Sequence, residues 1–324
     1  MRIAINGLGR VGRQVLRRIH GVPGLELVGV NDPADAATLA HLVTYDSVHG
    51  KAPFPVEVQA GHLVLDGLPV PLSAAPDPAR TPFGDLGAEV VLECSGRFTR
   101  RAEAAGHLRG SVRHVVISAP SPDADATVVP GVNASRREVL SAACPATHAL
   151  SLLVGALDAA FGVEAGLATA VESYGNDQRI LDLPHADPRM ARAAAMSMIP
   201  APTDMARCLG EALPWTRGRF EALAVRVPTP DVSILDLGAT LRTDADLESV
   251  HAALRRAGDG APGLVQFLEA PLVSVDLRGR EASCIVDPWL TRIHAPRFVK
   301  VFAWYDNEAA YAARLRDLCL ELAR

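Results

Sequence analysis

The chain has 324 residues, enough for two domains of ordinary size, and 49% of them are apolar, which is enough for a large core. The formal net charge of −5 provides no basic surface for a nucleic acid, so we expect no nucleic-acid partner. The five cysteines are widely spaced and never form a CxxC pair, which argues against a disulfide framework and against a zinc site.

No uncharged apolar run reaches about 18 residues, so no helix is expected to span a membrane. The chain begins directly on an apolar strand pattern, without the charged and apolar regions of a signal peptide. Together with the cysteine spacing, this predicts a soluble protein of the reducing cytoplasm with no structural metal.

The first third of the chain alternates short apolar runs with helical patterns. Residues 2–6 predict a buried strand, residues 11–19 a helix and residues 25–31 a second strand. The Pro-rich stretch 68–82 is interpreted as a surface loop. Runs rich in Val and Ile predict further strands at 88–94, 113–118 and 127–132. Strand, helix and strand in this order indicate a doubly wound α/β domain.

A second region begins near residue 144 with an Ala- and Leu-rich helix over 144–161. Period-two patterns predict strands of a larger, mostly antiparallel sheet at 220–230, 232–242 and 271–279. Helices are predicted over 247–258 and over 307–324, and the terminal helix is expected to pack back on the first domain. The expected division is therefore 1–143 and 144–306.

A GxGxxG pattern stands directly after the first strand and opens the first helix. Its first glycine permits a tight turn, the second lets the backbone approach a pyrophosphate, and the third lets helix and sheet close up. The helix N-terminus adds unpaired N–H groups and the positive end of a dipole. Asp32, which ends the next strand, can accept hydrogen bonds from a ribose and would repel the extra phosphate of NADP. The pattern predicts that NAD binds at Gly7, Gly9, Arg10, Val11, Gly12 and Asp32.

Several motifs then stand in order along the chain: INGLGRVGR (5–13), YDSVHG (45–50), SAPSPDADATVVPGVN (118–133), RVPTPDVSILDL (226–237) and WYDNE (304–308). With these motifs the whole chain resembles the glyceraldehyde-3-phosphate dehydrogenase family. Four segments resemble the erythrose-4-phosphate dehydrogenase branch more closely: 34–50, 125–133, 176–200 and 219–229. The resemblance implies a Rossmann-type NAD-binding domain, an α+β catalytic domain, a small aldehyde substrate and a homotetramer with segment 173–200 at a subunit interface.

In that family a cysteine thiolate attacks an aldehyde, the thiohemiacetal passes a hydride to NAD, and the resulting thioester is released. By position Cys144 matches the nucleophile, and it lies at a predicted helix start, where the dipole favours thiolate. The resemblance also places Ser118 and Asn307 at the cofactor. It places Arg226 and Thr203 in the anion sites.

The chain departs from the family at the acid–base position, where Glu172 replaces the catalytic histidine. A carboxylate beside Cys144 should raise the pKa of the thiol, and the loss of an oxyanion donor costs about 10²–10³ in rate. Three rescues are open. Glu172 can act as a base that activates water, His148 can supply an imidazole from one helical turn beyond Cys144, or a protonated Glu172 can donate to the oxyanion.

Phosphate recognition departs as well. Ala143 replaces a serine, and Asp204 adds a carboxylate that should repel phosphate. Gly175 falls on the family's threonine at the substrate phosphate, so Arg179 is the candidate for a replacement charge. The first hypothesis is an NAD-dependent aldehyde oxidoreductase that uses Cys144, with phosphate or water as acyl acceptor. The alternatives are a catalytically impaired, NAD-binding sensor or interaction partner, and a Cys-dependent hydrolase or acyl transferase without the redox step.

Overall fold

The computed structural model describes all residues, 1–324, and its contacts divide the chain into two compact units. The first unit comprises 1–130, 134–143 and 312–324, and the second comprises 131–133 and 144–311. All five cysteines are free thiols. The structure contains no helix with the length and apolar character that a membrane crossing requires.

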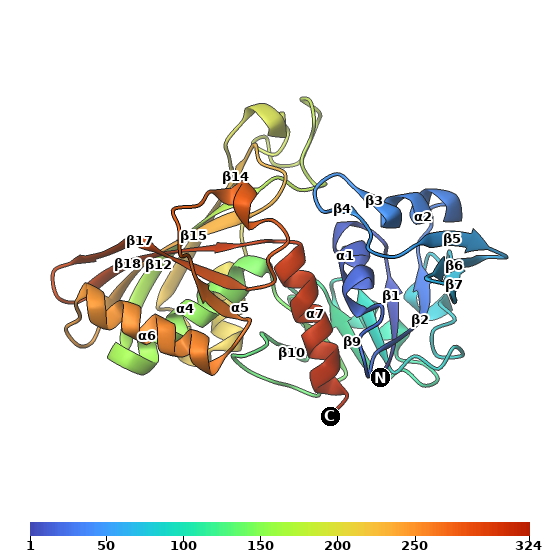
Figure 1. Ribbon diagram of the computed structural model, residues 1–324, viewed down its shortest axis with the longest axis horizontal. Coiled ribbons are helices and arrows are strands. Elements are labelled where there is room, and N and C mark those ends of the chain that lie inside the picture. The colour runs from blue at the N-terminus through green and yellow to red at the C-terminus, as the bar shows by residue number, and fades with distance from the viewer. The chain divides into compact units, whose positions relative to one another are not determined.

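The first unit is built on a nine-stranded sheet with the order β10-β11-β9-β8-β1-β2-β7-β6-β5 (Figure 1). The strands from β10 to β7 pair in parallel, and β6 and β5 add an antiparallel edge. The predicted α/β class is confirmed. Its helices and strands are β1 (Arg2–Asn6), α1 (Arg10–Ile19), β2 (Glu26–Asn31), α2 (Ala36–Thr44), β3 (Tyr45–Asp46), β4 (Gly50–Lys51), β5 (Val56–Gln59), β6 (His62–Leu65), β7 (Leu68–Ser73), η1 (Pro78–Arg80), β8 (Val90–Glu93), α3 (Arg101–Ala104), η2 (Ala105–His107), β9 (His114–Ile117), β10 (Ala126–Thr127) and β11 (Val139–Ser141).

The central strands of this sheet are almost completely buried. All four residues of β8, and all of β1 except its first, are buried. Strands that are covered on both faces need apolar side chains at every position, which explains why the sequence shows continuous rather than alternating apolar runs there. The carboxyl ends of β1, β2 and β8 lie at one edge of the sheet, since these strands are parallel neighbours. The glycine pattern begins at this edge.

The second unit contains a seven-stranded, mostly antiparallel sheet with the order β13-β14-β12-β15-β18-β17-β16. The helices α4, α5 and α6 lie against this sheet (Figure 1). Between helices and sheet, the unit buries a core rich in Leu, Val and Ala side chains. Its elements are α4 (Pro145–Phe161), β12 (Val163–Ser173), η3 (Ala194–Met196), β13 (Ile199–Ala201), α5 (Met205–Ala212), η4 (Pro214–Thr216), β14 (Phe220–Val227), β15 (Ser233–Leu241), α6 (Leu247–Gly260), β16 (Val265–Phe267), η5 (Ser274–Leu277), β17 (Cys284–His294), β18 (Phe298–Tyr305) and α7 (Ala309–Leu322), whose residues from Ala312 onward belong to the first unit.

The interpretation of 68–82 as a loop is wrong for its first part, because Leu68–Ser73 forms β7. The backbone N–H groups of the even-numbered residues of β7 point toward β6. The 3.2 Å hydrogen bond from the Leu72 N–H to the Gly61 carbonyl shows this. Pro69 and Pro71, which lack an N–H, therefore face the side of β2. There β2 pairs only with the last two residues, Leu72 and Ser73, so the prolines interrupt no ladder.

Two predicted strands are also wrong. Of the first, predicted over 127–132, only Thr127 lies in a strand, at the end of β10. Pro130 lacks an N–H donor and Gly131 has a φ of +82°, so the extended conformation does not continue. Within 271–279 the chain forms the short helix η5 instead of a strand. The Asp276 carboxylate accepts the Val273 N–H at 3.0 Å, and this local bond competes with sheet pairing.

Candidate active site

The chain turns sharply at Gly7, immediately after β1. Gly7 has a φ of +92°, and its N–H donates to the Asn31 carbonyl at 2.7 Å. A Cβ at Gly7 would lie 2.6 Å from the Ser95 backbone, and one at Gly12 would lie 2.0 Å from the Gly7 carbonyl oxygen. Close backbone packing therefore requires glycine at both positions.

Gly9 is different, because a Cβ there would meet nothing within 4 Å. Gly9 is the N-cap of α1, no side chain caps the helix, and its first turn, which includes Val11, holds no acidic residue. The N–H groups of a first turn have no acceptor within the helix and attract anions. This open, uncapped helix start fits the pyrophosphate of NAD.

The Asp32 carboxylate lies beside this turn. Its two oxygens accept the Leu8 N–H at 2.8 Å and the Ala34 N–H at 2.9 Å. A carboxylate offers about four lone-pair sites, so both oxygens can still accept a ribose hydroxyl. Asp32 is thus both fixed to the glycine turn and able to bind a ligand.

The Arg10 side chain forms an ion pair with Asp46 at 2.9 Å. Burial alone would raise the pKa of Asp46, but the backbone N–H groups of His49 and Val48 and the Arg10 guanidinium lower it to about 2. Arg10 therefore presents its backbone, rather than its paired side chain, in the first turn of α1. Ser118 follows β9, and its N–H and Oγ–H both donate to the Glu93 carbonyl at 3.0 Å.

In the second unit, Cys144 is the N-cap of α4, and Pro145 occupies the first helical position. The sulfur lies 3.1 Å from the hydroxyl oxygen of Thr147. Burial raises the pKa of the Cys144 thiol, the Thr147 hydrogen bond lowers it, and the nearby Glu172 charge raises it. The net pKa is raised, so the protonated thiol is the resting form and attack on an electrophile requires a base.

Glu172 and Arg226 lie directly opposite each other on the parallel neighbours β12 and β14. Arg226 Nη1 is 3.0 Å from Glu172 Oε2 and also donates to the Ser173 carbonyl at 3.1 Å. The other carboxylate oxygen, Oε1, accepts the Tyr305 hydroxyl at 3.5 Å. Burial raises the pKa of Glu172, while Arg226 and Tyr305 oppose this shift without cancelling it.

His148 lies one turn along α4 from Cys144, as its spacing predicts, but its ring points into the core. The residue is 1% exposed, and its ring centroid lies 5.5 Å from that of Tyr311. The hydrogen-bond partner of the Cys144 sulfur is Thr147. The geometry therefore places a carboxylate, rather than this imidazole, in the cluster around the thiol.

Asn307 follows β18, and its side chain is oriented by two hydroxyls. Its Oδ1 accepts the Ser173 hydroxyl at 3.0 Å and the Ser233 hydroxyl at 3.2 Å. With its oxygen held in this way, the amide presents its NH₂ group as a donor, which suits the carbonyl oxygen of a nicotinamide amide.

The two remaining anion-site candidates lie on other segments of the second unit. Thr203 Oγ1 accepts the Met205 N–H at 3.2 Å, at the start of α5. The neighbouring Asp204 pairs with Arg207 at 2.9 Å, so its repulsion of phosphate is partly neutralised. The Arg179 carbonyl accepts the Ala194 N–H at 2.8 Å. The Nε atom of the Arg179 side chain is buried without a hydrogen-bond partner in the protein.

Tyr305, Thr147, Ser173 and Ser233 were not identified from the sequence as members of this cluster. Tyr305 is 1% exposed, and burial and then the Glu172 charge raise the pKa of its hydroxyl, which stays protonated. Tyr305 stands in the WYDNE motif, two residues before Asn307. This position in the motif was the signal in the sequence that could have identified Tyr305. The hydroxyls of Ser173 and Ser233 come close to Asn307 only through the pairing of β12, β15 and β18, which the sequence does not show.

A doubly wound unit with this glycine turn, joined to an α+β unit, defines a two-domain dehydrogenase that binds NAD. Residues 1–101 match the family described as "Glyceraldehyde 3-phosphate dehydrogenase, NAD binding domain", and residues 143–307 match its "C-terminal domain". The chain belongs to the glyceraldehyde-3-phosphate dehydrogenase family.

Individual relatives match over the full length. The chain is 43% identical over 330 residues to glyceraldehyde-3-phosphate dehydrogenase 1 of Bacillus subtilis, covering 100% of this chain and 98% of the relative. It is 43% identical over 329 residues to the glyceraldehyde-3-phosphate dehydrogenase of Geobacillus stearothermophilus, with the same coverage. It is also 43% identical over 333 residues to the plasmid-encoded enzyme of Cupriavidus necator, again with 100% and 98% coverage.

Proposed function

We propose that the chain oxidises a small aldehyde with NAD, using Cys144 as nucleophile, Glu172 as base and water as the acyl acceptor. The 3.0 Å ion pair between Glu172 and Arg226 carries this proposal. By resemblance Arg226 binds an anion, and here a carboxylate of the protein already occupies one edge of its guanidinium. Inorganic phosphate must compete with this carboxylate, whereas water need not.

The residues share the steps as follows. Glu172 takes the thiol proton while the Cys144 sulfur bonds to the aldehyde carbon. When bound at the Gly7–Gly12 turn and Asp32, NAD would supply the hydride acceptor for this carbon, which would leave a thioester on Cys144. After its first proton has passed to solvent, Glu172 removes a proton from water as the water oxygen attacks the acyl carbon. The C–S bond breaks and the thiol regains a proton, so aldehyde, water and NAD become carboxylic acid, NADH and one proton.

The electrostatics of Glu172 suit this role. A buried carboxylate with a raised pKa is a stronger base than an exposed one and works closer to neutral pH. The thiol, whose pKa is also raised, requires such a base. The orientation of His148 toward Tyr311 removes the competing imidazole from this part of the proposal.

For the substrate we propose a small hydroxylated or phosphorylated aldehyde. Arg226 and Arg179 each keep a buried Nε without a protein partner, which supports binding of an anionic or hydroxylated group. Erythrose 4-phosphate is the first candidate, because of the segments that resemble that branch. Glyceraldehyde 3-phosphate is the second, because it appears in the names of the relatives.

The test is an NADH absorbance assay over these sugar phosphates and small aldehydes, with the product identified by NMR with and without added phosphate. We expect free acid in both cases. Glu172→Gln should lose turnover, and Glu248→Gln, a change at an exposed glutamate on α6, should not. An acyl phosphate as the main product would overturn the water-dependent mechanism, and Glu172→His should shift the product in that direction.

The raised pKa of Cys144 also favours a second candidate, an NAD-binding homologue that acts as a sensor or interaction partner. Mass spectrometry distinguishes the two. An acyl adduct on Cys144, captured by acid quench in the presence of NAD, establishes the covalent step, whereas folded, NAD-bound protein without an adduct over the whole panel supports the sensor.

We further propose a homotetramer. Leu167 and Leu223, on the neighbouring strands β12 and β14, are 69% and 68% exposed on the sheet face opposite the helices. Leu167 also lines a hollow of about 280 Å³ together with Phe298. Apolar surface of this kind is typical of a subunit interface. Light scattering should give four chains for the parent and fewer for Leu223→Glu, and a monomeric parent would refute the assembly.

A further inference from the structure

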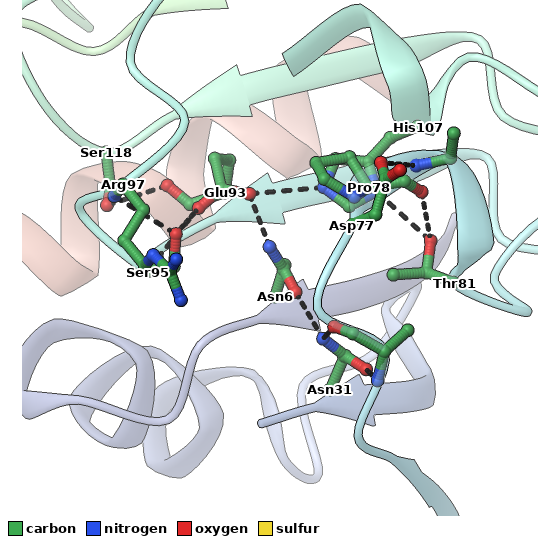
Figure 2. Close-up of polar contacts among 12 residues, drawn as sticks. Asn6, Asn31, Asp77, Pro78, Thr81, Glu93, Ser95, Arg97, His107 and Ser118 are labelled. Atoms are coloured by element: carbon green, nitrogen blue, oxygen red, sulfur yellow. Dashed lines mark hydrogen bonds and ion pairs between the residues drawn. The ribbon is translucent and has the colours of Figure 1, made fainter. Parts of the chain in front are cut away.

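A buried polar cluster at the carboxyl edge of the first unit's sheet takes no part in the chemistry above. Its centre is Glu93, the last residue of β8, which is 2% exposed (Figure 2). Burial of a carboxylate costs free energy unless its oxygens are hydrogen-bonded, so a buried carboxylate is expected to have several hydrogen-bond donors around it. The contacts of Glu93 identify these donors.

One carboxylate oxygen of Glu93 holds the chain segment behind the glycine turn. Glu93 Oε1 accepts the Ser95 N–H at 2.8 Å and the Ser95 hydroxyl at 2.5 Å. The Ser95 backbone is the surface against which Gly7 packs, since a Cβ at Gly7 would lie 2.6 Å from it. Glu93 therefore fixes the backbone segment against which the glycine turn packs.

The other oxygen begins a chain of hydrogen bonds across the strand ends. Glu93 Oε2 accepts the Asn6 side-chain N–H at 2.5 Å, and Asn6 Oδ1 accepts the Asn31 side-chain N–H at 2.7 Å (Figure 2). Asn6 immediately precedes Gly7, and Asn31 immediately precedes Asp32. The chain thus connects the residues on which the pyrophosphate turn and the ribose carboxylate depend.

Further contacts hold both ends of this chain. His107 Nε2 lies 3.1 Å from Glu93 Oε2, and His107 Nδ1 lies 3.2 Å from the Thr81 hydroxyl. At the other end, Asn31 Oδ1 accepts the Ser73 hydroxyl at 2.8 Å and the Ala75 N–H at 2.7 Å. Every polar side-chain atom of Asn6 and Asn31 forms a hydrogen bond within the protein. Such a fully bonded network favours a single arrangement of the two strand ends.

We propose that Glu93, Asn6 and Asn31 are positioning residues for NAD. Through them the protein fixes the separation between the Gly7–Gly12 turn and the Asp32 carboxylate before the cofactor arrives. A ligand that bridges two preformed groups loses less free energy to ordering than one that must bring them together. The cluster acts on affinity for NAD and touches neither Cys144 nor the substrate.

An exchange of partners tests this. Glu93→Gln keeps an acceptor for Ser95 but turns an NH₂ group toward the Asn6 NH₂ group, and Asn6→Asp brings two carboxylates together. In the double variant Asn6→Asp/Glu93→Gln, the glutamine donates to the new aspartate, which still accepts from Asn31. We expect the Kd for NAD, measured by calorimetry, to rise about tenfold or more in each single variant and to recover largely in the double variant.

Ser111→Ala is the matched control. The Ser111 hydroxyl contacts the Gly84 and Ala88 carbonyls at 2.9 and 2.7 Å, before β8 and thus at the opposite edge of the sheet. The Ser111→Ala variant should have a lower melting temperature than the parent and the same Kd for NAD. If Glu93→Gln does not fold, Asn31→Ala breaks the link alone. A folded Asn31→Ala or Glu93→Gln protein with the parent Kd, or a double variant as weak as the worse single variant, would overturn the proposal.

Discussion

The sulfur of Cys144 lies under opposing influences that single substitutions can separate. Burial raises the pKa of the thiol, the Thr147 hydroxyl lowers it, and the Glu172 charge raises it. Since only the thiolate is alkylated at an appreciable rate, the rate with iodoacetamide at fixed pH reports the thiolate fraction. This rate can be measured without any knowledge of the substrate.

We predict that Glu172→Gln and Thr147→Val change this rate in opposite directions. Glu172→Gln removes a negative charge, so alkylation of Cys144 should be faster even though turnover is lost. Thr147→Val removes a hydrogen bond worth about 1 kcal/mol, so alkylation should be about fivefold slower. Ser151→Ala, one turn further along α4, is the control and should match the parent. Equal rates for all four proteins would show that neither side chain acts on the thiol.

A second prediction concerns the partner of Glu172. Arg226 opposes the rise in the pKa of this carboxyl group, so Arg226→Gln should raise that pKa further, whereas Arg226→Lys keeps the charge and should raise it less. Carbon-13 NMR of labelled glutamate reports the titration directly. In the pH profile of kcat/KM, the acidic limb should move to higher pH in the same order. A glutamate titration identical in parent and Arg226→Gln would contradict the ion pair.

The sequence could predict Glu172 and Arg226 individually but not their pairing. The substitution at position 172 is visible because TAVES stands in the segment that resembles the family's. The ion pair depends on the register of two parallel strands that are separated by the loop 174–198 and by α5. No local pattern encodes such a register. The orientation of His148 toward Tyr311 could not be predicted from its spacing to Cys144 either, because Tyr311 lies on α7, far along the chain.

At the level of elements, the glycine turn and α1 permit a test that separates binding from folding. Gly9 has a φ of −67°, which any residue tolerates, and faces open space, so Gly9→Ala should leave stability within about 1 kcal/mol of the parent. Its methyl group would nevertheless enter the space expected for the pyrophosphate, and the Kd for NAD should rise.

Gly12→Ala is the counterpart, because its methyl group would collide with the Gly7 carbonyl. It should lower the melting temperature of the first unit by several degrees, in keeping with an overpacked position. Calorimetric melting and NAD titration of both variants provide the comparison. Loss of stability in Gly9→Ala, with binding retained, would place the pyrophosphate elsewhere.

Elements with strong local signals were predictable, and those that depend on partners were not. The strands at 2–6, 25–31, 88–94 and 113–118 are confirmed to within about two residues, because continuous apolar runs between turns have few alternatives. β12 was not predicted, since VEAGLATAVES is rich in small residues and is stabilised by pairing with β14 and β15 on both sides. β7 was missed because prolines suggest a loop until the unpaired side of the strand is known.

At the scale of the whole molecule, the residues proposed for NAD binding and for catalysis are distributed over both units. The glycine turn, Asp32 and the Glu93 cluster belong to the first unit, and Cys144, Glu172, Arg226 and Asn307 belong to the second. The fold class and NAD were predictable because the GxGxxG pattern is local. The sequence left phosphate and water open as acyl acceptor, because this choice depends on side chains that only the folded second unit brings together.

The second unit also contains a pair of buried acids. Asp231 and Asp306 are 3% and 0% exposed. Asp306 accepts the N–H groups of Gly279, Glu308 and Ala309 at 2.7, 2.9 and 2.6 Å, at the start of α7. Burial and the Asp306 charge raise the pKa of Asp231 to about 8. In the folded protein Asp231 therefore holds its proton at neutral pH.

This proton should make the stability of the second unit depend on pH. Between the unfolded pKa of 3.8 and the folded pKa of about 8, the folded state binds one more proton than the unfolded state. The contribution of Asp231 to the free energy of unfolding should therefore decrease as pH rises through this range, by at most about 1.4 kcal/mol per pH unit.

Asp231→Asn removes the titrating group, so the free energy of unfolding of the variant, relative to that of the parent, should increase from pH 5 to pH 8. All three tryptophans, Trp215, Trp289 and Trp304, belong to the second unit, so urea unfolding followed by tryptophan fluorescence reports this unit. Parallel stability curves for parent and variant across this range would mean that Asp231 is ionised in the folded protein, and that its charge is compensated within the fold.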